Sequence, residues 1–196
     1  KVPGAVHTIN GFGKPMGFEE VRELGMIESP IALTNTLNVG LVADALVQYA
    51  IQHNPNIGVR GPSINAIVGE TNDGFLNDIQ GRHVRAEHVF KAIDSAASGI
   101  VAEGAVGAGT GTTCFQWKGG IGSSSRVLPQ EAGGYTVGVL VQTNFGAAKD
   151  LHILGVPIGK QIVPPNQKHS PIPDGGSIMT VLATNAPLDP RQLRRL

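Results

Sequence analysis

Residues 174–183 read DGGSIMTVLA, a polar turn with two glycines that runs directly into a stretch of apolar residues. Ser177 therefore stands at the first position of a predicted strand, with Gly176 immediately before it. Attack of the Ser177 hydroxyl on the preceding carbonyl group needs an unusual backbone conformation, which glycine reaches without a Cβ clash. Taken alone, the same pattern also fits an ordinary loop that enters a strand.

Cleavage of the peptide bond between Gly176 and Ser177 would give Ser177 a free α-amine beside its hydroxyl. A free α-amine has a pKa of about 8, and burial lowers that pKa because it disfavours the ammonium form. The amine can then act as the base for the adjacent hydroxyl, the arrangement used by N-terminal-threonine hydrolases. This stretch is thus a candidate nucleophile and a candidate autocleavage site.

Apolar spacing elsewhere predicts a chain of mixed helices and strands. Helical spacing covers residues 42–50, which Asn54 and Pro55 close, and residues 86–97, which Gly99 follows. Strand-like runs lie at residues 5–9, 31–37, 64–68, 135–143, 151–154 and 177–184. The runs at 135–141 and 178–183 show little polar alternation, so we expect both strands to be covered on both faces. Helices grouped between strands indicate sheets layered with helices in a single domain.

The composition excludes several classes of partner. Lys and Arg number 15 and Asp and Glu number 15, so charged residues make up 15% of the chain, against about 25% in an ordinary soluble domain. A neutral chain without a basic run argues against nucleic acid, which requires neutralisation of phosphates. No apolar stretch approaches the ~18–20 residues needed to span a bilayer, so we predict a soluble protein with no membrane partner. The low charge suits a large interface.

No metal or organic cofactor is predicted. Cys114 is the single cysteine, which rules out an internal disulfide and a cysteine-based zinc site and suits a cytoplasmic location, a periplasmic one remaining open. The six histidines are scattered without metal-ligand spacing. Residues 104–111, GAVGAGTG, lack the last glycine and the following helix of a dinucleotide fingerprint, so close backbone packing is the better interpretation. The serines at 123–125 are interpreted as a polar loop.

Nine ordered blocks resemble the β-peptidyl aminopeptidases, also described as L-aminopeptidase/D-amidase/D-esterases, which are self-processing N-terminal-serine hydrolases. The matching blocks are NGFGKP (10–15), LTNT (33–36), GETNDG (69–74), LND (76–78), GAVGAGTG (104–111), KGGIG (118–122), VLVQTNFG (139–146), GSI (176–178) and ATNAPL (183–188). They cover nearly the whole chain, which makes the resemblance highly specific.

The resemblance implies an α/β (α+β) fold class, specifically an αββα sandwich like that of N-terminal-nucleophile hydrolases. It also implies two subunits cut from one precursor and a homotetramer of processed heterodimers. Residues 1–176 would then be part of the large subunit and residues 177–196 the start of the small one, within one domain (1–196) that is incomplete at the C-terminus and the N-terminus. The family's further active-site serine and glutamate would lie beyond Leu196.

Carried over position by position, the resemblance makes Ser177 the nucleophile and the bond between Gly176 and Ser177 the processing site. Asn144 matches the oxyanion-hole asparagine. Glu70 matches the acid that receives the substrate's free amino group, which suits a carboxylate because a buried ammonium needs a paired charge. Asn72 stands where some members have a tyrosine that helps to stabilise the oxyanion, and Phe75 is expected to line the pocket or to pack in the core.

The predicted function is therefore that of a serine aminopeptidase or amidase that releases N-terminal residues from short peptides, amides or esters. The reaction would pass through an acyl-enzyme on Ser177. One alternative is acyl transfer like that of the ornithine acetyltransferases, which look similar in fold but use threonine as the new N-terminus. The other alternative is an uncut, non-catalytic assembly module that retains only the scaffold.

Overall fold

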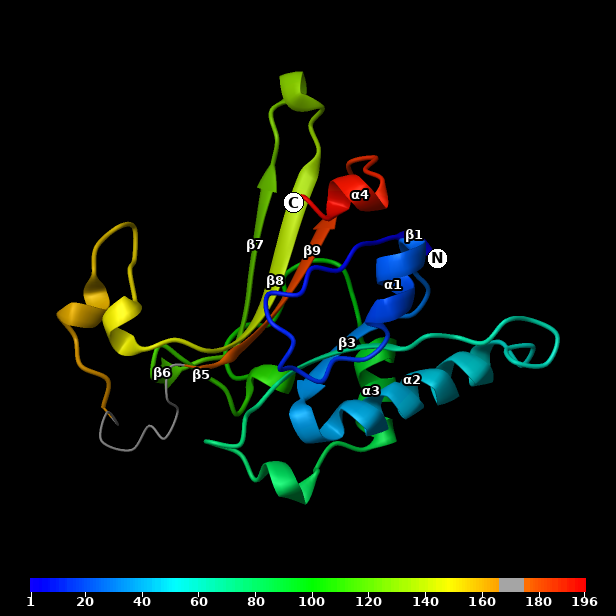
Figure 1. Ribbon diagram of the computed structural model, residues 1–196, viewed down its shortest axis with the longest axis horizontal. Coiled ribbons are helices and arrows are strands. Elements are labelled where there is room, and N and C mark those ends of the chain that lie inside the picture. Colours follow the sequence, from blue (N-terminus) through cyan, green and yellow to red (C-terminus); the bar gives the residue numbers. More distant parts are fainter. Residues whose placement is uncertain (166–174) are drawn as a thin grey trace. The chain divides into compact units, whose positions relative to one another are not determined.

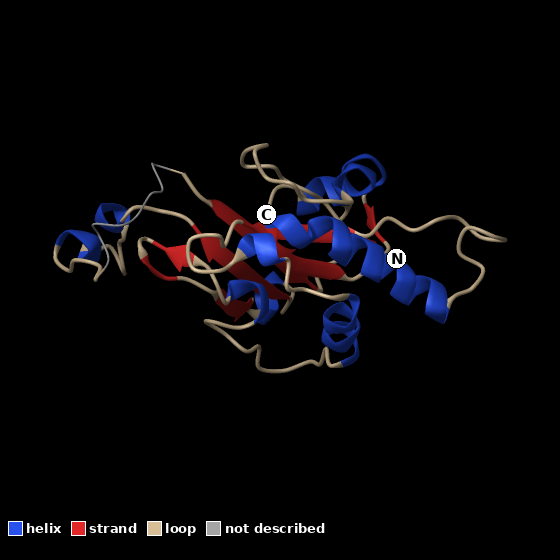
Figure 2. Cartoon of the chain, turned by 90° about the horizontal axis from the view of Figure 1, so that it is seen from below, coloured by secondary structure: helices blue, strands red, loops and turns tan. Residues whose placement is uncertain are grey.

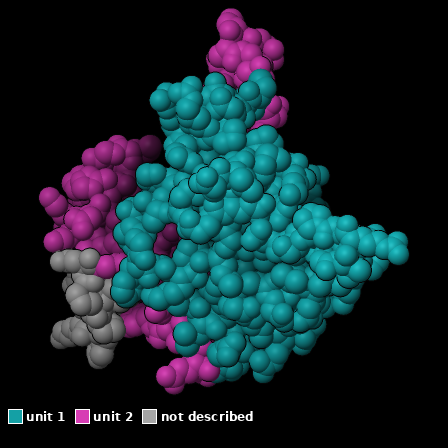
Figure 3. Space-filling model, turned by 45° about the vertical axis from the view of Figure 1, so that its right-hand side comes forward, with its two compact units in different colours: residues 1–69, 81–99, 186–196 teal, residues 70–80, 100–185 magenta. Residues whose placement is uncertain are grey.

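The computed structural model describes residues 1–165 and 175–196 (Figure 1). The chain forms two compact units, which Figure 3 colours separately. The first unit comprises Lys1–Gly69, Gly81–Gly99 and Ala186–Leu196, and the second comprises Glu70–Gln80 and Ile100–Asn185. Of the turn that precedes Ser177, Asp174 lies outside the described residues, whereas Gly175 and Gly176 lie within them.

The first unit contains the longer helices of the chain, drawn in blue in Figure 2. Its elements are β1 (Val2–Pro3), α1 (Phe18–Leu24), β2 (Met26–Ile27), β3 (Ile31–Asn35), η1 (Thr36–Asn38), α2 (Val39–His53), α3 (Ala86–Asp94) and α4 (Pro190–Leu193). Strand β3 pairs with β4 (Ile67–Thr71), whose first three residues belong to this unit.

Helix α2 contains the helix that was predicted at residues 42–50. Its apolar residues recur at helical spacing, and Val42, Ala45 and Leu46 are buried in a core that also takes in Val89 of α3. A hydrogen bond of 2.7 Å from the Tyr49 hydroxyl to Asp94 links the two helices. Full burial of a valine or leucine side chain contributes roughly 1.5–3 kcal/mol. Apolar packing around α2 therefore holds the first unit together.

The second unit is built on an antiparallel sheet in which β8 lies between β7 and β9. Its elements are η3 (Gly107–Gly109), β5 (Thr113–Cys114), β6 (Trp117–Lys118), β7 (Ile121–Val127), η4 (Gln130–Ala132), β8 (Thr136–Asn144), η5 (Ala148–Asp150), η6 (Ile158–Lys160) and β9 (Ser177–Thr184), and η2 (Ile79–Gly81) begins in it. The β8–β9 register sets Asn144 directly opposite Ser177. This pairing depends on the strands predicted at 135–143 and 177–184, and both are confirmed.

Several local predictions are wrong. The serines at 123–125 lie in β7 rather than in a loop, because an edge strand accepts polar side chains, and Ser123 also bonds through its N–H and hydroxyl to Glu103. Residues 5–9 form no strand, and residues 151–154 enter a turn in which Ile153 and Val156 bond to each other. The strand expected at 64–68 begins only at Ile67.

The predicted second helix is also shorter than expected, since α3 ends at Asp94. The expectation that β9 is covered on both faces fails within the described residues, where the Leu182 side chain on that strand is 47% exposed. Strand β9 pairs with β8 on one edge only among the described strands, so a continuous apolar run did not here mean a strand buried on both sides.

Candidate active site

The end of β4 delivers two of the predicted site residues. All five residues of this strand are buried, and successive side chains of a strand point to opposite faces. Glu70 is 5% exposed near the end of the strand, Thr71 beside it points to the opposite face, and Asn72 directly follows the last residue of β4. The sequence folds here as a strand because Ile67 and Val68 are β-branched and fit a fully buried, pleated environment.

Two further predicted site residues, Asn144 and Ser177, lie in the sheet of β7, β8 and β9. Because Asn144 and Ser177 are partners in the β8–β9 ladder, their side chains lie on the same face of the sheet. The Nδ2 atom of Asn144 lies 3.3 Å from the Ser177 hydroxyl oxygen and donates to it. Asn144 is 6% exposed, so this contact is largely removed from water.

A second donor reaches the same oxygen from the residue that directly follows β4. The backbone N–H of Asn72 donates to the Ser177 hydroxyl oxygen at 3.3 Å. The two donors are also joined to each other, since Asn144 Nδ2 donates to the carbonyl oxygen of Asn72 at 2.6 Å. The geometry thus brings Ser177, Asn144 and Asn72 together, although they are far apart in the sequence.

The orientation of the Asn144 amide is fixed by the first residue of β5. The backbone N–H of Thr113 donates to Asn144 Oδ1 at 3.2 Å. A backbone N–H can only donate, so the amide oxygen must face Thr113 and the Nδ2 group must face Ser177. Nδ2 is therefore held as a hydrogen-bond donor toward Ser177.

Asn72 meets Ser177 through its main chain, which the sequence did not indicate. Its side-chain Oδ1 accepts a hydrogen bond from the backbone N–H of Gly74 at 3.0 Å, which forms a local Asx turn. The resemblance indicated a side-chain role at position 72, whereas the contact with Ser177 is made by the backbone N–H.

Phe75 follows in the same turn and is 38% exposed. Within residues 1–165 and 175–196, no ring contact or hydrogen bond joins it to Ser177. Its predicted place in a substrate pocket therefore stays a prediction.

Gly176 fits a space that admits no side chain. A Cβ atom at this position would lie 2.5 Å from the Cα and Cβ atoms of Phe145 and 2.8 Å from the carbonyl oxygen of Asn144. Such distances are far inside van der Waals contact, so any larger residue would displace the start of β9. The glycine is needed for this close approach of the backbone to the segment that carries Asn144.

A buried hydrogen-bonded pair that sequence reasoning missed joins the two halves of the site. Gln142, which is fully buried, donates through Nε2 to the Thr71 hydroxyl at 2.7 Å and to the carbonyl oxygen of Ala108 at 3.3 Å. Gln142 lies two residues before Asn144, and Thr71 lies between Glu70 and Asn72. The pair therefore links the strand ends that carry the donors to Ser177.

Within the glycine-rich residues at 104–111, the predicted close packing holds for Gly109 and Gly111, whereas a Cβ atom on Gly104 or Gly107 would meet nothing within 4 Å. A Cβ atom on Gly109 would lie 2.6 Å from the backbone nitrogen of Ile121, and one on Gly111 would lie 2.9 Å from the side chain of Asn77. No long helix follows, because the 3-10 turn η3 leads directly into β5. The segment brings the Ala108 carbonyl against Gln142.

Cys114 is not poised to compete with Ser177 as a nucleophile. Burial raises the pKa of the Cys114 thiol above its ordinary value, so the thiol stays protonated at neutral pH.

Across the described parts of the chain, no group of three or more His, Cys, Asp or Glu side chains could hold a metal ion. No helix there is both long and apolar enough to cross a membrane.

Comparison with known proteins places this geometry in a family. The model of peptidase family S58 matches residues 1–196. The chain is 42% identical over 201 residues to the beta-peptidyl aminopeptidase BapA of Sphingosinicella microcystinivorans, a match that covers 96% of this chain and 50% of that protein.

Two solved structures are similar over nearly the whole chain. The Burkholderia sp. beta-aminopeptidase has a TM-score of 0.89 and 44% identity, and the match covers 98% of this chain and 52% of that one. The L-aminopeptidase D-Ala-esterase/amidase from Ochrobactrum anthropi, described as a variant of the Ntn hydrolase fold, has a TM-score of 0.89 and 37% identity, with 98% and 52% covered.

Likeness at these identities shows that the chain has the α/β fold of the Ntn-hydrolase type, and the predicted fold class is confirmed. The chain belongs to peptidase family S58, which confirms the resemblance drawn from the sequence blocks. It spans about half the length of the curated relatives that it matches.

Proposed function

We propose that this chain carries the nucleophile and oxyanion site of a self-processing serine aminopeptidase or amidase. The observation that carries the proposal is the convergence of two N–H donors, from Asn144 and from the Asn72 backbone, on the hydroxyl oxygen of Ser177. A tetrahedral oxyanion forms on the carbon that Ser177 attacks, beside these donors. One such donor is worth about 2.7–4 kcal/mol of transition-state stabilisation in other hydrolases.

Processing comes first in this mechanism. The Ser177 hydroxyl oxygen attacks the carbonyl carbon of Gly176, the carbon–nitrogen bond breaks, and the Ser177 nitrogen takes up the hydroxyl proton. Water then hydrolyses the resulting ester, which restores the hydroxyl and leaves a carboxylate on Gly176. The tight contact of Gly176 with Phe145 supports a backbone held in one geometry for this attack.

Catalysis then uses the amine that processing releases. The Ser177 hydroxyl attacks the substrate carbonyl while the α-amine takes its proton, and the Asn144 amide and the Asn72 N–H stabilise the oxyanion. The proton passes to the leaving amine, which departs and leaves an acyl-enzyme on Ser177. Water hydrolyses that ester and returns the enzyme to its starting state.

The substrate class is proposed from Glu70. This carboxylate is buried in β4, two residues before Asn72, and a carboxylate is the group that pairs with a substrate's free ammonium in a desolvated site. Such a pairing favours short peptides, amides or esters with a free N-terminal residue. Phe75, in the next turn, would line the pocket. The mechanism requires no metal ion or organic cofactor.

The proposed assembly is a homo-oligomer, a tetramer of processed heterodimers in the cytoplasm. Aliphatic side chains are exposed along the segment that follows η5, a pattern typical of a surface that another chain covers. They are Ile153, Leu154, Val156, Ile162 and Val163.

The decisive experiment compares Ser177→Ala with a matched serine variant, Ser123→Ala, in the intact protein. With an aminoacyl p-nitroanilide as substrate, Ser177→Ala should release no p-nitroaniline, and Ser123→Ala should retain the parent rate. Retained hydrolysis in Ser177→Ala would overturn the proposal. Acetyl transfer to an amino-acid acceptor without hydrolysis would favour the acyltransferase alternative, and no turnover by an uncut parent would favour the assembly module.

A further inference from the structure

The ammonium group of Lys118, the last residue of the tight hairpin of β5 and β6, is held by three main-chain carbonyls. Its Nζ atom donates to the carbonyl oxygens of Gly109 at 2.9 Å, Thr112 at 3.1 Å and Gly119 at 2.6 Å. A lysine ammonium has three N–H donors, so all three are used on the backbone. Burial lowers the pKa of Lys118, as expected for a cation partly withdrawn from water.

One of these carbonyls belongs to a peptide group whose other end reaches the candidate site. The Thr112 oxygen, which also accepts from the Gly119 N–H at 2.9 Å, is part of the same peptide unit as the Thr113 N–H. That N–H donates to Asn144 Oδ1 at 3.2 Å. The amide of Asn144 in turn donates to the Ser177 hydroxyl oxygen at 3.3 Å.

We propose that Lys118 is a positioning residue that acts on Ser177 through two successive amide groups, the peptide between Thr112 and Thr113 and the side chain of Asn144. We call this series of contacts the relay. This inference rests on the proposed function of Ser177 and Asn144. A cation on a carbonyl oxygen withdraws electron density from its amide, which makes the N–H at the other end a stronger donor. The same contacts fix the direction of that N–H.

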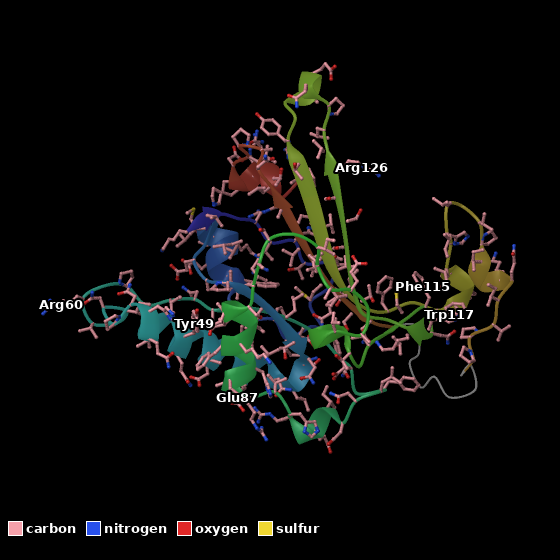
Figure 4. All side chains as sticks on the ribbon, turned by 180° about the vertical axis from the view of Figure 1, so that it is seen from behind. Tyr49, Arg60, Glu87, Phe115, Trp117 and Arg126 are labelled. Carbon is pink, nitrogen blue, oxygen red and sulfur yellow. The ribbon has the colours of Figure 1, made fainter. Side chains whose placement is uncertain are left out.

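The hairpin that carries Lys118 is held in place at a conformational cost. Phe115 and Gln116 have φ angles of 49° and 69°, and for residues with a Cβ the left-handed region costs roughly 1–2 kcal/mol each. Phe115 donates its N–H to the Phe145 carbonyl at 2.7 Å, and Gln116 accepts from the Ala148 N–H at 3.1 Å. Figure 4 labels Phe115 at this hairpin. The hairpin is thereby joined to the segment immediately after Asn144.

The competing explanation is that Lys118 only closes its own loop. Loop closure would affect the stability of the protein and the KM as much as the kcat. The relay instead predicts a loss confined to kcat, because the Asn144 amide acts on the oxyanion of the transition state. It also predicts that the positive charge matters separately from the length of the side chain.

The test places two side chains of matched length at position 118, one that ends in an ammonium and one that ends in a neutral amide. In a Cys114→Ser reference protein, Lys118→Cys is alkylated either with 2-bromoethylamine, which restores an ammonium at the position of Nζ, or with iodoacetamide, which places a neutral amide nitrogen there. We expect the ammonium form to recover kcat to within about threefold of the reference. The amide form should stay about tenfold or more below it, with KM within twofold and an unchanged melting temperature.

Equal kcat values for the two alkylated forms would overturn the relay. So would a fall in kcat that is matched by a rise in KM and a lower melting temperature. If the Lys118→Cys precursor does not mature, the same comparison is made on the rate at which the alkylated precursor cleaves between Gly176 and Ser177. The Ser177→Ala variant separates the two proposals. Activity in that variant would refute the proposed function. If Ser177→Ala is inactive and the two alkylated forms have equal kcat values, only the relay is refuted.

Discussion

The two compact units are stabilised in different ways. Buried apolar side chains of the described residues lie almost entirely in the first unit, most of them around α2, and the second unit adds only Ala148 and Pro164. The buried residues of the second unit are otherwise largely polar: Glu70, Thr71, Asp73, Thr112, Gln142 and Asn144. Apolar packing thus dominates the interior of the first unit, although Ser29, Thr34, Asn35 and Asn38 are also buried there. The second unit relies more on directional hydrogen bonds, such as those of Gln142 with Thr71 and of Asn144 with Ser177.

The difference follows from what each kind of interaction can do. Apolar burial stabilises a fold without fixing the position of any one atom closely, and cores tolerate substitutions that keep the volume. A buried hydrogen bond adds little net stability, but removal of one partner leaves the other buried and unpaired, which lowers the stability by more than the bond contributed. We therefore expect substitutions in the first unit to change stability, and substitutions in the second to change kcat.

The largest expected effect is that of Asn144→Ala. Removing the Nδ2 donor should lower kcat by about 10²–10³-fold, as the loss of one oxyanion-hole donor does in other hydrolases. The measurement is steady-state hydrolysis of an aminoacyl p-nitroanilide. Asn185→Ala is the matched control, because Asn185 bonds the Thr136 backbone in the same unit, away from Ser177. Equal rates for the two variants would contradict the oxyanion role of Asn144.

The counterpart in the first unit is Leu46→Ala. Leu46 is 2% exposed in the core around α2, so the cavity should cost about 2–5 kcal/mol of unfolding free energy. Denaturant unfolding measures this loss, and kcat of the folded fraction should stay within twofold. Leu24→Ala, at a side chain that is 66% exposed, is the control and should change stability little. A large fall in the kcat of folded Leu46→Ala would contradict the expectation that substitutions in the first unit change stability and not kcat.

A smaller effect is expected from the pair of Thr71 and Gln142. Thr71→Val removes the hydroxyl that accepts from Gln142 Nε2 and keeps the side-chain shape. The strand ends that carry Asn72 and Asn144 should then shift, which lowers kcat by about tenfold, and unfolding free energy should fall by roughly 1–3 kcal/mol. Thr71→Ser retains the hydroxyl and should recover most of the kcat. If Ser and Val behave alike, the hydrogen bond does not position the site.

The smallest expected effect is on the pKa of Glu103, which lies beside β7, and on the stability that depends on this carboxyl at low pH. Hydrogen bonds from the Ser123 hydroxyl and backbone N–H lower the pKa of the Glu103 carboxyl below its ordinary value of 4.5. Because the folded pKa is the lower one, the stabilisation is complete above the ordinary pKa and is lost as the pH falls through the folded pKa. NMR titration should find the lowered pKa, and Ser123→Ala should raise it toward 4.5. An unchanged pKa in that variant would contradict the assignment.

The sequence predicted the elements whose signal is local. The apolar spacing of α2 and the strand that starts at Ser177 could both be read directly, and Asn144 and Glu70 followed from the family blocks. The hydrogen bonds that make the site could not be read in this way. Gln142 and Thr71 are 71 residues apart, and Thr113 and Asn144 are 31 apart.

Such long-range pairs leave no periodic pattern, because they depend on the strand register and not on spacing along the chain. The Asn72 backbone donor is invisible for a further reason, since every residue but proline has an N–H. The serines of β7 misled the prediction because polar edge strands resemble loops.

The most direct test of the account is mass spectrometry of the purified, catalytically active protein. Self-processing at Ser177 predicts two polypeptides, one ending at Gly176 and one beginning at Ser177, and a single uncut polypeptide in the Ser177→Ala variant. Full hydrolytic activity in a protein whose bond between Gly176 and Ser177 is intact would contradict it.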